Sequence, residues 1–191
     1  MKALRLGLAA FASALVSLPL WAADSYTVDP AHTHPSYEIS HLGWSTQRGR
    51  FDKVSGKITL DRAAKTGTVD ITIEVASIST GVPKLDEHLQ SEDFFNVAKY
   101  PTMTYKSRAM NFSGGAPVSV DGELTLLGVT KPVTLTITAF HCALNQFIKK
   151  EDCGADATAT IKRSEFGMTK YVSVGLGDDV KLLINVEAIK D

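Results

Sequence analysis

The chain has 191 residues, 44% of them hydrophobic, and a formal net charge of −1 at pH 7. This length suits one domain that is large enough to bury a core of its own. The near-neutral charge excludes the basic surface that binding to nucleic acid or to anionic lipid headgroups would require.

The first 22 residues have the layout of a secretory signal peptide. Lys2 and Arg5 precede an apolar run from Leu6 to Leu20, and Ala22 supplies a small residue before a cleavage point. The run is short for a membrane span, and an uncleaved N-terminal anchor is the competing interpretation. We expect cleavage to leave residues 23–191, with 18 basic and 21 acidic residues and a net charge of −3. This mature domain should be soluble, without a stable membrane anchor.

Most of the mature chain alternates apolar and polar residues with the period of two that indicates β-strands. Val69, Ile71, Ile73 and Val75 show the pattern clearly, with polar residues between them. The alternation recurs at 118–126, 133–139 and 180–186, and the further strand candidates are 35–41, 49–60, 102–112 and 153–163. Short turns such as Gly114-Gly115 separate these segments. Eight sequential strands of this kind predict an antiparallel meander.

These eight strands favour an all-β fold in which the sheet closes into an antiparallel barrel. Closure buries one apolar face of each strand and removes the exposed sheet edges. A two-sheet sandwich is the alternative. Residues 82–100 break the alternation, because Leu85 and Leu89 are four apart and Ser91 precedes Phe94-Phe95. This stretch predicts a short helical excursion between strands at one end of the barrel, either a lid or a packed connection.

Cys142 and Cys153 are the two cysteines of the chain. In an exported protein a single pair predicts a disulfide bond. A loop this short would stabilise the fold by about 3 kcal/mol on the chain-entropy model. A metal-binding or redox pair is the alternative, although the spacing matches neither a CxxC motif nor a zinc knuckle.

The size of the inward side chains decides whether such a barrel is filled or hollow. Ala155, Ala157 and Ala159 share the face of Ile161, and Gly122 interrupts the apolar face of 118–126. Small inward residues leave volume unless aromatic side chains reach across, and the candidates to do so are Tyr37, Phe51, Tyr105 and Phe140. The pattern predicts an apolar tunnel that would select a hydrocarbon chain. A filled barrel is the alternative.

Several stretches carry a specific family pattern. They are GELTLLGVTKPV at 122–133, HLQSEDFFN at 88–96 followed by Tyr100-Pro101, the run His32, His41-Leu42-Gly43 and Gly49-Arg50-Phe51, and SEFGM at 164–168. Together they resemble the YceI-like family of bacterial periplasmic proteins over essentially the whole mature chain. The resemblance implies a lipocalin-like eight-stranded barrel that encloses a polyisoprenoid or a similar lipid. It also implies a periplasmic location and no accepted catalytic activity. The Cys142–Cys153 loop is not shared by every member.

The candidate ligand-binding residues surround the expected tunnel and its mouth. His41 shares a face with Tyr37 and Ile39, and its neutral imidazole could hydrogen-bond a lipid headgroup or a backbone carbonyl. Arg48 and Arg50 could bind a phosphate group, or they could lie on a solvated strand end. The full set is Tyr37, Ile39, His41, Trp44, Arg48, Arg50, Phe51, Phe94, Phe95, Tyr105, Ala155, Ala157, Ala159, Phe166 and Met168. Trp44 is expected at the rim, and Phe166 and Met168, two apart, are expected on one wall.

Metal-binding and catalytic patterns are weak in this sequence. His32 and His34 would share a face of a strand, but a zinc site needs three or four convergent ligands with tighter spacing than the histidines offer. The chain lacks a GxSxG nucleophile motif. We therefore expect no metal, no cofactor apart from a bound lipid, no catalytic residues and no enzymatic activity.

The function predicted from the sequence is a periplasmic carrier for a long-chain isoprenoid lipid, such as a quinone or a prenyl phosphate. One alternative is a non-catalytic, stress-responsive structural or interaction protein with a filled barrel. Another is an enzyme that acts on an isoprenoid and depends on His41. A homodimer is compatible with the resemblance, although no motif requires one, and nucleic acid is not an expected partner.

Overall fold

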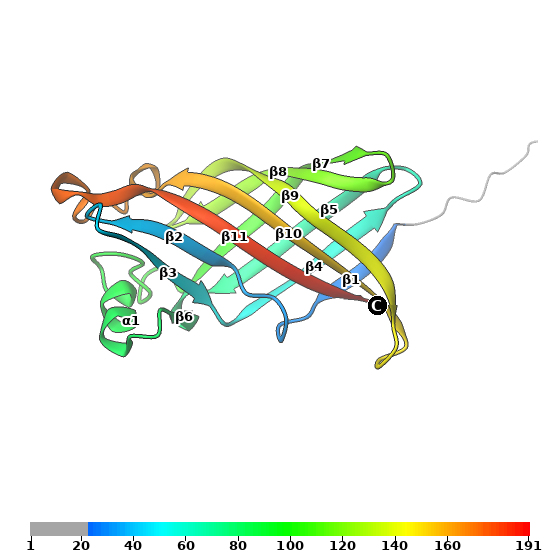
Figure 1. The fold of residues 1–191 in the computed structure, drawn as a ribbon, viewed down its shortest axis with the longest axis horizontal. Coiled ribbons are helices and arrows are strands. Elements are labelled where there is room, and N and C mark those ends of the chain that lie inside the picture. Colours follow the sequence, from blue (N-terminus) through cyan, green and yellow to red (C-terminus); the bar gives the residue numbers. More distant parts are fainter. Residues whose placement is uncertain (1–22) are drawn as a thin grey trace, which may run out of the picture.

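The computed structural model describes residues 23–191, so the predicted signal peptide at 1–22 lies outside the described residues. Strands dominate this part of the chain, with short helical segments between some of them (Figure 1). The elements are β1 (Asp24–Val28), β2 (Ser36–His41), β3 (Ser45–Phe51), β4 (Val54–Asp61), β5 (Thr66–Glu74), η1 (Val75–Ser77), β6 (Ile78–Ser79), α1 (Pro83–Gln90), β7 (Thr102–Ser113), β8 (Ala116–Leu126), β9 (Val129–Asn145), β10 (Lys150–Lys162), η2 (Arg163–Phe166), η3 (Val172–Val174) and β11 (Leu176–Lys190).

The strands form one antiparallel sheet that closes on itself. Their order is β1-β4-β5-β7-β8-β9-β10-β11-β2-β3-β6, and β1 also pairs with β11. The double pairing of β1 closes a ring of eight strands within residues 23–191, with Tyr26 opposite Lys190 and Val28 opposite Ala188. The predicted eight-stranded antiparallel barrel is therefore confirmed, and the two-sheet sandwich is wrong.

Three further strands, β2, β3 and β6, continue ring strands beyond breaks in the chain. β1 and β2 both pair with β11, and the break between them contains Pro30 and Pro35. Proline has no backbone N–H to donate to a sheet, which explains why the ladder is interrupted there. β3 leads into β4 after a two-residue break, and β5 leads into β6 through η1.

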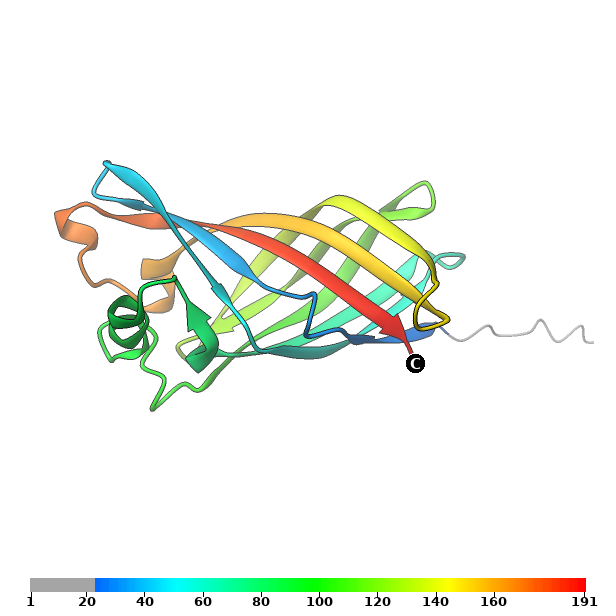
Figure 2. The same ribbon diagram turned by 60° about the horizontal axis from the view of Figure 1, so that its bottom comes forward.

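The three breaks lie side by side and are hydrogen-bonded to one another. The N–H of Phe51 donates to the carbonyl of Pro35 over 3.0 Å, and the N–H of Asp52 donates to the carbonyl of Ser77 over 3.1 Å. On the far side of these three breaks, β2 and β3 extend the barrel wall toward the end where α1 lies (Figure 2).

Seven of the eight predicted strands correspond to ring strands, with differences at their ends, and the eighth corresponds to β2, which lies outside the ring. Prediction 35–41 corresponds to β2, 49–60 runs through the break between β3 and β4, and 133–139 is the middle of the 17-residue β9. β1 was missed because DSYTV is a short segment at the start of the mature chain.

Residues 82–100 form the predicted helical excursion, which is α1 followed by turns. Proline at the first helical position is favourable because its missing N–H needs no partner there. Asp86 Oδ1 accepts from the N–H of Thr80 over 2.8 Å and from the Thr80 hydroxyl over 2.6 Å. The Phe95 ring meets the Phe51 ring edge-on, with centroids 5.6 Å apart. Through these contacts the excursion packs against one end of the barrel.

The opposite end carries the C-terminus and the β9–β10 turn (Figure 1). Cys142 and Cys153 face each other across β9 and β10 and form a disulfide with an S–S distance of 2.03 Å, as the sequence predicted. None of the helices in residues 23–191 is long and apolar enough to cross a membrane.

Candidate functional site

A cavity of about 530 Å³ lies inside the barrel. Its lining comes from strands around the whole ring and is almost entirely apolar. Representative lining side chains are Ile39, Ile71, Ile73, Val120, Leu124, Leu135, Ile161, Leu182 and Ile184. The inward-facing residues of the strands therefore surround an open cavity in addition to forming a packed core. The filled barrel, which was the alternative, is wrong.

Small inward residues contribute to this space in two different ways. Ala155 and Ala157 line the cavity directly, as expected. The expectation that Gly122 leaves volume is wrong, because Tyr105 occupies it: a Cβ on Gly122 would lie 2.5 Å from Tyr105 Cζ. Tyr37 covers Gly49 in the same way, since a Cβ there would lie 2.5 Å from the phenol oxygen. Each glycine makes room for a tyrosine ring from the neighbouring strand.

The phenol groups of these tyrosines remain protonated inside the wall. The Tyr105 hydroxyl donates toward the carbonyl oxygens of Val120 and Val133, each 2.9 Å away. Burial raises the pKa of Tyr105 far above its usual range and raises the pKa of Tyr37 to about 12. The cavity wall therefore gains aromatic surface without gaining a charge.

One end of the cavity is blocked by Tyr26, Leu60 and Ala188, which form a separate buried cluster beside the disulfide. The Tyr26 hydroxyl donates to Glu151 Oε1 over 2.6 Å. Burial is the main cause that raises the pKa of Tyr26, and the hydrogen bond to Glu151 is the second. This end is therefore filled by a neutral ring anchored to a carboxylate.

The other end opens to solvent near α1, η3 and the β2–β3 turn. We call it the mouth, because its lining includes residues that are also exposed, such as Leu42, Tyr171 and Val174. Polar side chains in the lining here include His41, Gln47, Arg48 and His88. The His88 ring stands edge-on to Phe94, with centroids 5.0 Å apart, and to Tyr171 at 6.4 Å. The mouth thus combines imidazole groups with an aromatic wall.

Most of the predicted ligand-binding residues come together around this cavity. The residues in the lining are Tyr37, Ile39, His41, Arg48, Phe51, Phe94, Phe95, Tyr105, Ala155, Ala157 and Met168. Four others lie outside it: Trp44, Arg50, Ala159 and Phe166. Their placement has specific physical causes.

Arg50 lies outside because of strand parity. Gly49 and Phe51 are buried inward, so the period of two turns Arg48 and Arg50 outward. Arg50 Nε forms an ion pair with Asp52 Oδ1 at 2.7 Å, and Arg48 Nε donates to Glu38 Oε1 over 2.7 Å across the β2–β3 pair. Of these two arginines, only Arg48, in the middle of β3, also belongs to the cavity lining.

The remaining three follow from local backbone structure. Trp44 ends the β2–β3 turn and is 83% exposed, so it lies at the rim, as expected, without entering the cavity. Ala159 packs against the core cluster. Phe166 closes the 3₁₀ helix η2 and is 1% exposed in the core, whereas Met168 follows Gly167, whose φ is +89°. The two-residue spacing of a strand does not apply across this turn.

Several lining residues were missed by the sequence reasoning. The inward face of β11, including Leu182 and Val186, was visible in the alternation but was not assigned to the site. Arg163 had no sequence signal, because arginine is normally exposed. Its side chain is buried, and its guanidinium donates to the carbonyls of Gly177, Met168 and Lys170 at 2.7, 3.0 and 2.8 Å. Burial lowers the Arg163 pKa.

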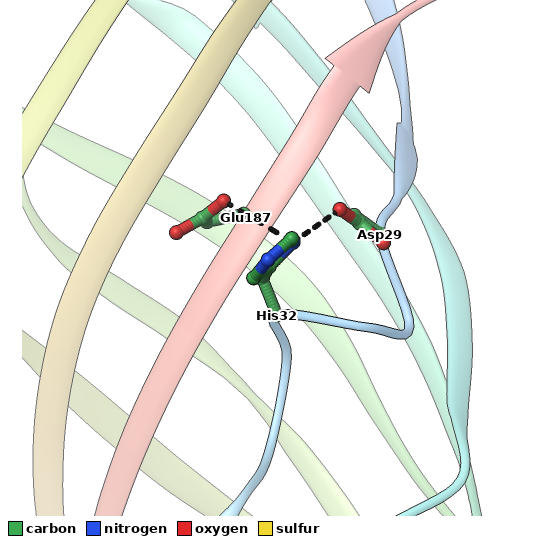
Figure 3. A group of neighbouring side chains, drawn as sticks. All are labelled: Asp29, His32 and Glu187. Atoms are coloured by element: carbon green, nitrogen blue, oxygen red, sulfur yellow. Dashed lines mark hydrogen bonds and ion pairs between the residues drawn. The ribbon is translucent and has the colours of Figure 1, made fainter.

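Asp29, His32 and Glu187 form a cluster on the outside of the barrel (Figure 3). His32 Nδ1 lies 2.7 Å from Asp29 Oδ2 and 3.8 Å from Glu187 Oε2. The hydrogen bond to Asp29 raises the His32 pKa, and that bond also lowers the Asp29 pKa. The loop that carries Asp29 and His32 is bound to β11, since the N–H of Asp29 donates to the carbonyl of Glu187 over 2.9 Å. These ligand types could hold a metal, but the ion-paired turn that fastens the β1–β2 break accounts for every contact.

Comparison with known proteins identifies one domain family and relatives that belong to it. Residues 26–188 match the YceI-like domain family. The protein YceI of Escherichia coli O17:K52:H18 is 34% identical over 193 residues, covering 100% of this chain and 99% of that protein.

Two solved structures share the fold. The crystal structure of Burkholderia cenocepacia BcnA has a TM-score of 0.72 and 26% identity, covering 84% of this chain and 98% of that chain. A polyisoprenoid binding domain from Saccharophagus degradans, implicated in plant cell wall breakdown, has a TM-score of 0.64 over 87% of this chain and 98% of that chain. At 16% identity, the second likeness concerns the fold alone.

Proposed function

This chain belongs to the YceI-like family, and from that membership and its hollow barrel we propose that it binds a long-chain isoprenoid lipid inside the cavity. The ligand class comprises polyisoprenoids, isoprenoid quinones and prenyl phosphates. The role proposed is binding and carriage of the lipid, without chemical conversion.

The observation that carries the proposal is the apolar cavity. Its volume of about 530 Å³ falls within the range of roughly 300–1,000 Å³ that is usual for small-molecule sites. Because the lining is aliphatic and aromatic, affinity would come from hydrocarbon burial at about 25 cal/mol for each Å² removed from water. A ligand with many hydrogen-bonding groups would leave those groups unpaired in this lining.

The shape of the cavity favours a chain over a compact molecule. Lining residues extend from Tyr26, at the blocked end, to Val174 at the mouth. A flexible hydrocarbon tail can follow this path with its terminus toward Tyr26. The polar end of the lipid would then lie at the mouth, near His41 and His88.

Two further points support the ligand class and the location. The fold is shared with the polyisoprenoid binding domain of Saccharophagus degradans. We also propose that residues 1–22 are a signal peptide and that the mature protein works in the periplasm. The apolar run behind Lys2 and Arg5 supports export, and the Cys142–Cys153 disulfide supports an oxidising compartment.

The first test is extraction of the natural ligand. Mature protein purified without detergent from the producing organism is extracted with organic solvent, and the extract is analysed by mass spectrometry. We expect a long isoprenoid compound in near-stoichiometric amount. An empty protein that also fails to take up an added isoprenoid quinone would overturn the proposal.

The second test blocks the cavity. Ala157 is buried and lines the space, so Ala157→Trp should reduce quinone uptake by roughly tenfold or more. Asp156→Trp places the same ring on the exposed outer face of β10 and should leave uptake unchanged. Ala155→Phe is a smaller blocking change, for use if Ala157→Trp unfolds the barrel.

A further inference from the structure

Four large apolar side chains are exposed at the mouth. Their exposure to water does not contribute to the stability of the fold. Leu42 is 37% exposed, Trp44 83%, Tyr171 44% and Val174 65%. A single exposed apolar residue is ordinary on a protein surface, but a group around the opening of an apolar cavity is not. We call these four residues the mouth rim.

The mouth rim is continuous with the cavity. Leu42, Tyr171 and Val174 belong to the cavity lining as well as to the surface. The β2–β3 turn and the η3 segment touch each other, because a Cβ on Gly175 would lie 3.6 Å from Leu42 Cδ2. Both segments lie at the same end of the barrel in Figures 1 and 2. The apolar surface therefore runs without interruption from the inside of the barrel to its outer edge.

Two rim residues, Leu42 and Tyr171, have left-handed backbone (positive φ), which glycine and asparagine adopt more easily. Leu42 has φ +55° and Gly43 has φ +76°, and the N–H of Trp44 donates to the carbonyl of His41, as in a type I′ turn. Asparagine or glycine is the usual residue at the position of Leu42. Tyr171 has φ +61°. Leucine at the β8–β9 turn, Leu127, has φ +53° but packs against the core, whereas Leu42 is directed to the exposed rim.

Two positively charged side chains near the rim are paired with carboxylates of the protein. Arg48 is paired with Glu38 at 2.7 Å, and Lys170 is paired with Asp93 at 2.9 Å. A surface with paired charges and projecting apolar groups fits a partner that offers hydrocarbon below a polar layer. Tryptophan and tyrosine favour that boundary, because their rings have an apolar body and a polar edge.

We propose that the mouth rim docks on the surface of a phospholipid bilayer, so that the cavity opens directly toward the lipid acyl region. The proposal rests on the proposed lipid-binding function and adds the surface at which the ligand enters and leaves. A tail that passes between bilayer and barrel at this contact stays in an apolar environment. Docking is driven by apolar insertion, so it requires no anionic lipid.

Trp44 provides a built-in reporter for this contact. It is the only tryptophan after residue 22, because the other one is Trp21. With the mature protein and phosphatidylcholine vesicles, we expect a blue shift of the tryptophan emission and co-flotation of protein with the vesicles. An unchanged emission spectrum and absence of co-flotation would overturn the proposal.

A matched pair of variants identifies which end of the barrel docks. Trp44→Ser should weaken co-flotation with vesicles by roughly tenfold. Phe147→Ser is the control, since Phe147 is 96% exposed on the β9–β10 turn at the opposite end. We expect Phe147→Ser to float as the wild type does. The reverse result, or docking that depends on a protein added to the vesicles, would contradict the assignment.

Ligand loading separates this proposal from the proposed function. Trp44 lies outside the cavity lining, so Trp44→Ser should take up quinone from detergent micelles as the wild type does, but should take it up from vesicles more slowly. Equal transfer from vesicles by both proteins would overturn bilayer docking and leave lipid binding intact. Failure of both proteins to load from micelles, together with normal flotation, would contradict the proposed function instead.

Discussion

Two tyrosine–glycine pairs determine how much of the barrel interior remains open. Tyr105 lies over Gly122, and Tyr37 lies over Gly49, each ring occupying the space of a missing side chain on the next strand. Their phenol groups carry no charge, and Tyr105 satisfies backbone carbonyls of β8 and β9. The rings therefore lie flat against the wall, and the centre is left for a ligand.

A methyl group at Gly122 tests this packing. Gly122→Ala should destabilise the fold by about 1–3 kcal/mol, because the new Cβ overlaps the Tyr105 ring and that ring is held by its hydroxyl. Gly154→Ala on β10 is the control, since its Cβ would have ordinary contacts at 3.7 Å. Denaturant unfolding of the two variants measures the difference. Equal stability of both would show that the Tyr105 ring can move away freely.

The Asp29–His32 pair makes a pH-dependent contribution to stability. Its hydrogen bond raises the His32 pKa above 6.5 and lowers the Asp29 pKa below 3.8. The histidine part is fully present below pH 6.5 and is lost as pH rises through the raised folded-state pKa. The aspartate part is present above pH 3.8 and is lost as pH falls through the lowered folded-state pKa. The pair therefore stabilises the fold most between those limits.

Replacing the imidazole should reveal this window. His32→Asn should lower the melting temperature more at about pH 5.5 than at about pH 8.5. His141→Asn, which changes an exposed histidine of β9 outside the pair, should show no such difference. A His32→Asn effect that is independent of pH would mean that the ion pair is not what stabilises the β1–β2 break.

At the scale of the elements, alternation predicted the strands well, but it did not predict their interruptions. The range 49–60 reads as one strand, and the chain does follow one course there, but it breaks between β3 and β4. The break lies beside the one caused by Pro30 and Pro35, to which it is hydrogen-bonded through Phe51. The break shifts the alternation by one residue, because the buried inward positions are Gly49 and Phe51 in β3 but Val54 and Leu60 in β4. The period of two is the same on both sides, so the prediction of one strand over 49–60 passed over this shift.

The β9–β10 hairpin carries a disulfide that can be tested by itself. Replacing both Cys142 and Cys153 with serine should lower the free energy of unfolding by about 3 kcal/mol, because the unfolded chain gains the entropy of an open loop. The bond joins directly paired residues of neighbouring strands, so the folded barrel should survive. Denaturant unfolding gives the loss, and far-ultraviolet circular dichroism checks the sheet. Loss of the sheet signal before denaturant is added would contradict a purely local role.

At the scale of the whole molecule, strand parity predicted most of the candidate site, because it fixes which side chains face inward. Parity placed Tyr37, Ile39 and His41 on one inner face, and they do line the cavity. It could not predict the mouth, where the irregular segments around η2 and η3 bring Arg163 and Tyr171 to the barrel end. The volume of the cavity was also out of reach, since Gly122, which suggests space in the sequence, is covered by Tyr105 from the neighbouring strand.

A hollow barrel should gain stability from the molecule that fills it. A ligand that binds only the folded state adds about 2.7 kcal/mol when its free concentration is a hundred times the dissociation constant. For a domain of this size, that gain corresponds to a rise of roughly 5–10 °C in melting temperature. Protein stripped of lipid by solvent or by refolding should therefore melt lower than loaded protein, and added isoprenoid quinone should restore the difference.

The Ala157→Trp variant separates filling of the cavity from nonspecific effects of lipid. Its introduced ring occupies the space next to Ile137 and Ile184, which pair with Ala157 on the neighbouring strands and line the cavity. Its melting temperature should be the same with and without quinone, whereas Asp156→Trp should respond as the wild type does. Differential scanning calorimetry at matched lipid concentration makes the comparison. An equal rise in the melting temperature of all three proteins would place the lipid on the outer surface. Binding inside the barrel predicts a rise only for the wild type and Asp156→Trp, in which the cavity is open.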